Sequence, residues 1–102
     1  MAKVQVIARA VAREGKEDDL RTLLQSMLAP THLEPGCELY ELYESDVEGR
    51  FYFYEIWESQ TALDEHAATP HYRHLQQTLG ELLEEPFEIN LLAEIPIGTT
   101  AR

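Results

Sequence analysis

The sequence has a single cysteine, Cys37, so no disulfide can form within the chain, and a zinc site built from several cysteines is excluded. A lone thiol is typical of a reducing compartment, and we therefore predict a cytoplasmic protein. No apolar run approaches the roughly 20 residues that span a bilayer. The N-terminal MAKVQVIARAV has no apolar core of the kind found in signal peptides. The sequence thus predicts no membrane partner.

Basic residues are also scarce. Eight Lys and Arg stand against 19 Asp and Glu, which gives a formal net charge of −11. Phosphate backbones are bound by clustered Lys and Arg, so we predict no nucleic-acid partner. The sequence contains no GxGxxG or Walker A loop for a nucleotide and no GxSxG turn for a serine nucleophile.

The 102 residues are enough for one domain, and we predict a single domain over 1–102. Alternating apolar residues predict a first strand over 3–11. A helix follows, because Leu20, Leu23, Leu24, Met27 and Leu28 have the spacing of one helical face. Pro30 is expected to end it. The later elements are strands over 37–44, 50–57 and 87–95, a helix over 59–67 capped by Ser59, and a helix that starts at Thr69-Pro70 and stops before Pro86.

The order β-α-β-β-α-β predicts an α+β, ferredoxin-like fold, in which an antiparallel sheet carries its helices on one face. The third strand, RFYFYEIW, is apolar on both faces. Phe51, Phe53 and Trp57 share one face, and Tyr52, Tyr54 and Ile56 share the other. Two helices cover one side of the sheet only. We therefore expect a homodimer in which the helix-free faces pack together.

The chain resembles the antibiotic biosynthesis monooxygenase (ABM) domain family, which includes quinol monooxygenase-like proteins. The resemblance extends over nearly the whole chain and rests on an ordered set of features: Glu34-Pro35-Gly36-Cys37 and Tyr40, then Tyr54-Glu55-Ile56-Trp57, then Ala62-Leu63-Asp64-Glu65-His66, and finally His71. It implies a dimeric α+β barrel with a ligand cavity between sheet and helices in each protomer. Family members differ in chemistry: some oxygenate phenols or quinols without metal or flavin, relatives degrade haem, and others isomerise small phosphates.

His66 is the predicted catalytic base. It shares a helical face with Ala62 and Leu63, so it should point toward the sheet, and the resemblance implies that a helix histidine here acts as base or ligand. A structural histidine near a helix C-terminus is the alternative interpretation. Glu55 is the second predicted catalytic residue, lining the cavity and orienting His66 or a substrate hydroxyl. The alternative interpretation is that Glu55 lies near the end of the strand and reaches water or an arginine there.

Four residues are predicted to bind substrate. Trp57 shares a strand face with Glu55 and would stack on an aromatic ligand, although a purely core role is the alternative. Phe53, Tyr72 and His71 complete the predicted substrate site.

We predict no metal and no other cofactor. The spacing of His66, His71 and His74 matches no standard zinc pattern, and the three residues lie on both sides of a helix restart at Pro70. Haem-degrading relatives carry an asparagine on the first strand, whereas Asn90 is the one asparagine here and falls on the fourth.

The resulting hypothesis is a cofactor-independent monooxygenase that acts on a quinol or polyphenol with O2, the small aromatic substrate itself supplying the electrons. An isomerase or a small-molecule binding module on the same dimeric scaffold is the first alternative. A structural dimer without catalysis is the second.

Overall fold

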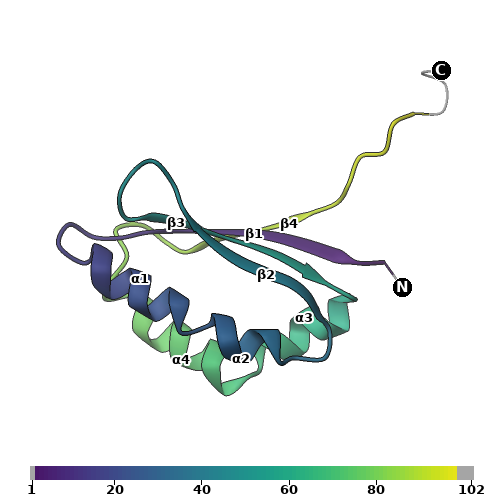
Figure 1. The fold of residues 1–102 in the computed structure, drawn as a ribbon, viewed down its shortest axis with the longest axis horizontal. Coiled ribbons are helices and arrows are strands. Elements are labelled where there is room, and N and C mark those ends of the chain that lie inside the picture. Colours follow the sequence, from purple (N-terminus) through teal and green to yellow (C-terminus); the bar gives the residue numbers. More distant parts are fainter. Residues whose placement is uncertain (1, 99–102) are drawn as a thin grey trace.

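The computed structural model describes residues 2–98, which form four strands and four helical segments (Figure 1). The strands are β1 (Val4–Val11), β2 (Cys37–Glu44), β3 (Arg50–Trp57) and β4 (Glu88–Leu92), and the helices are α1 (Glu17–Gln25), α2 (Leu28–His32), α3 (Gln60–Ala67) and α4 (Pro70–Leu79). None of these helices has the length and apolar character needed to cross a membrane.

The four strands form one antiparallel sheet in the order β2-β3-β1-β4. The four helices all lie against the same face of this sheet (Figure 1). The predicted α+β ferredoxin-like fold is therefore confirmed. The strands β1 and β3 are central, so a side chain on their helix-facing side is enclosed by neighbours on all sides.

The alternation of β3 places its side chains as the sequence predicted. Phe51, Phe53 and Trp57 are almost completely buried under the helices, and Val6, Ala8 and Ala10 of β1 lie beside them. The opposite face carries Tyr52, Tyr54 and Ile56, which are only partly covered. An aromatic layer thus remains on the face that no helix covers.

The first predicted helix is wrong at its C-terminal end. α1 ends at Gln25, and the chain turns before α2 begins at Leu28. Pro30 lies inside α2 as its third residue and does not end the helix. The first N–H groups of a helix have no carbonyl partner within it, so a proline there costs no hydrogen bond. Met27 is still buried, because the turn keeps it on the core side.

The end of the chain also differs from the prediction. α4 stops at Leu79, and the predicted helical residues Leu82 and Leu83 are buried in the turn that follows. The last strand is shorter than the predicted 87–95. Residues 93–98 leave the sheet and extend away from the rest of the molecule (Figure 1), and Ile95 is 91% exposed there.

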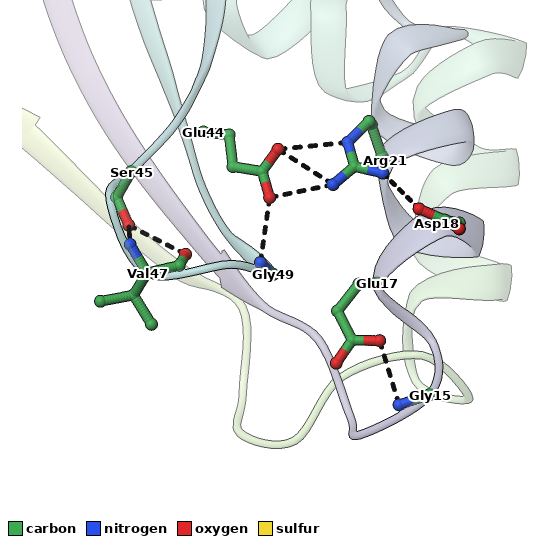
Figure 2. Close-up of polar contacts among 8 residues, drawn as sticks. All are labelled: Gly15, Glu17, Asp18, Arg21, Glu44, Ser45, Val47 and Gly49. Atoms are coloured by element: carbon green, nitrogen blue, oxygen red, sulfur yellow. Dashed lines mark hydrogen bonds and ion pairs between the residues drawn. The ribbon is translucent and has the colours of Figure 1, made fainter.

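A group of polar contacts joins the β2–β3 hairpin to α1 (Figure 2). Arg21 of α1 donates to both carboxylate oxygens of Glu44, at 2.9 and 3.0 Å, and the backbone N–H of Gly49 donates to Glu44 at 3.0 Å. Gly49 has φ +83°, a conformation that favours glycine. These contacts hold the hairpin at the end of the sheet remote from α3.

Candidate functional site

A cavity of about 180 Å³ lies between the sheet and the helices α3 and α4. Its wall is mostly apolar, with a few polar groups. Fourteen residues line it: Val6, Ala8, Tyr40, Phe53, Glu55, Gln60, Leu63, Asp64, His66, Ala67, Tyr72, Leu75, Phe87 and Ile89. Apolar enclosure around a small number of polar atoms is the usual form of a small-molecule site.

His66 reaches this cavity from the last turn of α3. Ser59 starts the helix by accepting a hydrogen bond from the Ala62 N–H, and this cap fixes which face turns inward. The imidazole is 2% exposed. Its ring centroid lies 4.6 Å from that of Trp57 and 5.0 Å from that of Tyr72. Three aromatic side chains, with Tyr40 at 5.6 Å, therefore hold the ring in place.

The two nitrogens of His66 have different environments. Nδ1 lies 2.8 Å from Oε2 of Glu34, whereas Nε2 is buried and has no hydrogen-bond partner among residues 2–98. Burial lowers the pKa of His66, and the hydrogen bond to Glu34 opposes that shift. The ring is therefore mainly neutral at pH 7. A carboxylate only accepts, so the single proton lies on Nδ1 and Nε2 carries a free lone pair.

Glu34 is a site residue that the sequence reasoning missed. It lies in the turn between α2 and β2, and its Oε2 also lies 2.7 Å from Nε2 of His71 on α4. One carboxylate oxygen thus joins histidines of α3 and α4 to a turn 32 and 37 residues away in the chain. The Glu34-Pro35-Gly36 segment indicated a turn, and nothing in its spacing indicated a histidine partner.

Glu55 lines the cavity as predicted, but the structure gives it a different neighbour. The Trp57 indole N–H donates to Oε1 of Glu55 at 2.9 Å. Burial, with only 6% of the residue exposed, raises the pKa of Glu55 to about 7, which the Trp57 bond opposes and the charge of Glu34 reinforces. The carboxylate that bonds to His66 is Glu34 and not Glu55, so of the two roles predicted for Glu55 only the contact with a substrate hydroxyl stays a prediction.

The predicted substrate residues divide into two groups. Phe53 and Tyr72 lie on the cavity wall with His66 and Glu55. Trp57 and His71 are not among its lining residues, and they bond to Glu55 and Glu34 respectively. His74 is exposed on α4 and takes no part.

The residues Glu34, His66 and His71 also offer metal-ligand atoms. One oxygen and two ring nitrogens lie within 4.8 Å of one another. Glu34 thus stands in this group in place of the exposed His74.

Comparison with known proteins identifies the family. The antibiotic biosynthesis monooxygenase family matches residues 4–78. The chain belongs to this family. It is 42% identical over 92 residues to the Mycobacterium tuberculosis protein named "Putative monooxygenase Rv0793", covering 90% of this chain and 91% of that protein. The structure of Rv0793 superposes with a TM-score of 0.89 at 40% identity, over 96% of this chain and 100% of the other.

Two further solved structures share this ABM fold. PA3566 from Pseudomonas aeruginosa has a TM-score of 0.88 at 27% identity, over 94% of this chain and 97% of the other. A protein described as an "antibiotic biosynthesis monooxygenase" has a TM-score of 0.85 at 28% identity, over 91% of this chain and 99% of the other. Membership of the ABM family and its fold are thus established for this chain.

Proposed function

We propose that this ABM protein is a cofactor-independent monooxygenase that oxidises a small quinol or polyphenol, with His66 as the base. The observation that carries the proposal is the state of His66. Its Nε2 is a buried acceptor without a protein partner among residues 2–98, on a ring that lines an apolar cavity. A buried acceptor in a cavity wall is suited to receive a proton from a bound ligand.

The reaction begins with transfer of a substrate hydroxyl proton to Nε2 of His66. The resulting quinol anion gives electrons to O2; one oxygen atom enters the ring, the other leaves as water, and a hydroxylated quinone remains. A phenol has a pKa of about 10 against about 6.5 for histidine, so the transfer is uphill by about 5 kcal/mol. Burial of His66 widens this gap, and contacts to the anion must narrow it.

Glu55 is the residue proposed to make such a contact. With a pKa raised to about 7, it is partly protonated at neutral pH and its acid O–H can donate to a substrate oxygen. An ionised Glu55 would instead repel the anion. The Trp57 N–H occupies only Oε1, so Oε2 remains for the ligand.

The cavity favours a small aromatic substrate. Its volume of about 180 Å³ is below the usual range of drug-sized pockets, about 300–1,000 Å³. Phe53, Tyr40 and Tyr72 supply ring surfaces for an aromatic ligand to pack on. The proposed reaction needs no metal or flavin, because the quinol is itself the reductant.

We also propose that the protein is a homodimer through its helix-free sheet face, and that the reducing cytoplasm indicated by its lone thiol is its compartment. Tyr52, Tyr54 and Ile56 on that face form an apolar layer that a second copy would cover.

The test is oxygen uptake with a panel of hydroquinones. His66→Gln should lower turnover by roughly 10²–10⁴-fold, because it removes the proton acceptor while keeping a polar side chain of similar reach. His74→Gln, which changes an exposed histidine of α4, is the matched control and should keep the wild-type rate. Full activity in His66→Gln, or no uptake above autoxidation by the wild type, would refute the proposal.

A second candidate is an isomerase. A neutral histidine and a protonatable acid on one cavity could move a proton between two atoms of a substrate without O2. Anaerobic turnover separates the two candidates, because the monooxygenase stops without O2 and an isomerase does not.

A further inference from the structure

We propose that Glu34, His66 and His71 form a binding site for a divalent first-row transition-metal ion such as Zn²⁺ or Co²⁺. The three side chains come from the α2–β2 turn, α3 and α4, and they bring Glu34 Oε2, His66 Nδ1 and His71 Nε2 within 4.8 Å of one another. Two imidazoles and one carboxylate suit these ions, whereas Mg²⁺ and Ca²⁺ prefer oxygen ligands alone.

The distances are close to those that an ion requires. Each ring nitrogen lies 2.7–2.8 Å from the Glu34 oxygen. Ligand atoms bound at 2.0–2.1 Å to one ion are separated by about 2.9–3.4 Å, in octahedral or tetrahedral geometry. Binding an ion therefore requires the Glu34 oxygen to move a few tenths of an ångström away from each ring nitrogen. The two ring nitrogens, which lie within 4.8 Å of each other, must approach by up to about 1.4 Å to reach the tetrahedral separation. Rotation of the partly exposed His71 can supply both movements.

The site has a route to solvent. The side chains of Glu34 and His71 are 13% and 21% exposed, whereas His66 is 2% exposed. An ion can thus enter from the side of Glu34 and His71 and meet Nδ1 of His66 last. The formal net charge of −11 favours the approach of cations.

Binding of an ion changes the tautomer of His66. Its neutral ring carries one proton, placed on Nδ1, which faces Glu34. When an ion takes that nitrogen, the proton moves to the other nitrogen of the same ring. For His66 this means a change from Nδ1–H to Nε2–H.

That change has a consequence for the cavity. With the site filled, Nε2 of His66 is a donor and has no lone pair for a substrate proton. Metal binding should therefore inhibit the proposed oxygenase and not assist it. This consequence rests on the proposed function, whereas the metal site itself does not.

The binding test uses Co²⁺ as the probe and untagged protein. The visible absorption of bound Co²⁺ reports imidazole coordination. Titration of the protein with Co²⁺ should show one ion per chain. His71→Ala and Glu34→Gln should each weaken the Co²⁺ affinity by at least about 100-fold, since even residues behind a ligand cost 10–100-fold. His74→Ala, three residues further along α4 and exposed, should bind like the wild type.

The outcomes are decisive in either direction. Saturable binding that both ligand variants lose and His74→Ala keeps supports the site. No spectral change in wild-type protein, or equal binding by all four proteins, shows a hydrogen-bonded cluster only and overturns it. Circular dichroism confirms that the variants fold, and because they change different elements, misfolding of one leaves the other as the test.

A second measurement tests the inhibition. Zn²⁺ should suppress hydroquinone-dependent oxygen uptake by the wild type, and a chelator should restore it. In His71→Ala, inhibition relative to that variant's own rate should require at least about 100-fold more Zn²⁺. Binding without inhibition would overturn the proposed effect on His66. A wild type without oxygen uptake would refute the proposed function, while the Co²⁺ titration would still decide the metal site.

Discussion

The pKa of Glu55 is set by two opposing effects, burial and a hydrogen bond. Burial disfavours its charge, and the Trp57 N–H is the hydrogen bond that partly offsets this cost. Its pKa is raised from an ordinary 4.5 to about 7. The folded protein therefore holds this proton at pH values where the unfolded chain has released it.

This difference predicts how stability depends on pH. Because the folded state binds the extra proton, the free energy of unfolding should fall as pH rises from 4.5 to about 7. The contribution of Glu55 is about 3 kcal/mol at most, at 1.36 kcal/mol per pKa unit. Glu55→Gln should remove it, so the variant should gain stability relative to the wild type between pH 5 and pH 8.

Urea unfolding at pH 5 and pH 8 measures this gain. Glu58→Gln, an exposed acid three residues further along, controls for the general effect of removing one negative charge. If the free energies of unfolding of Glu55→Gln and Glu58→Gln, each relative to the wild type, depend on pH in the same way, Glu55 is ionised in the folded protein. Its proposed donation to substrate then fails as well.

At the scale of elements, the contact between the α2–β2 turn and α3 positions the site. Gly36 in this turn lies directly against Ala62 of α3: a Cβ added at Gly36 would lie 2.3 Å from the Ala62 Cβ. The Gly36 carbonyl also accepts the Glu58 N–H at 2.9 Å, which joins the turn to the end of β3. Glu34 is on one side of this contact and His66 on the other, so the close approach sets their separation.

Gly36→Ala should therefore destabilise the protein by roughly 1–3 kcal/mol through overpacking. It should also reduce activity, because α3 moves away from Glu34. Ala62→Gly alone should cost about 1 kcal/mol of helix propensity. In the double variant the clash is gone, so its stability loss should be smaller than the sum of the two single losses.

Denaturant unfolding of the four proteins gives the coupling energy. Additive losses would mean that Gly36 and Ala62 do not contact each other as described.

At the scale of the whole molecule, the main open surface is the helix-free face of the sheet. Tyr54 lies there opposite Ile7 of β1, and Tyr52 and Ile56 lie opposite Arg9 and Gln5. A surface of this composition on a chain with net charge −11 favours a specific partner over general association. A second copy of the chain is the proposed partner.

The protein should sediment at micromolar concentration as twice its 11.7 kDa mass. Tyr54→Asp should dissociate the dimer or unfold the protein, because it would leave a charge in a buried apolar layer. Gln77→Asp, on the exposed side of α4, adds the same charge elsewhere and should leave the dimer intact. A wild-type protein that sediments as a stable monomer would contradict the proposed interface.

Most of the elements, and the faces that they bury, could be predicted from local patterns in the sequence. The strand bounds 37–44 and 50–57, the Ser59 and Thr69 caps and the buried face of β3 were all predicted correctly. These features follow from side-chain period and local capping, which involve residues a few positions apart. The same reasoning placed His66 and Glu55 on the inward faces of their elements, where both are found.

Only the tertiary structure decided which side chains meet. Glu34 lies in a turn 32 residues from His66 and 37 from His71, and its contacts depend on how the α2–β2 turn packs on α3 and α4. Trp57 holds Glu55 and does not line the cavity, because side chains on one strand face divide between cavity and core according to the helices above them. Periodicity sets the direction of a side chain, whereas its partner is set by packing between elements distant in the chain.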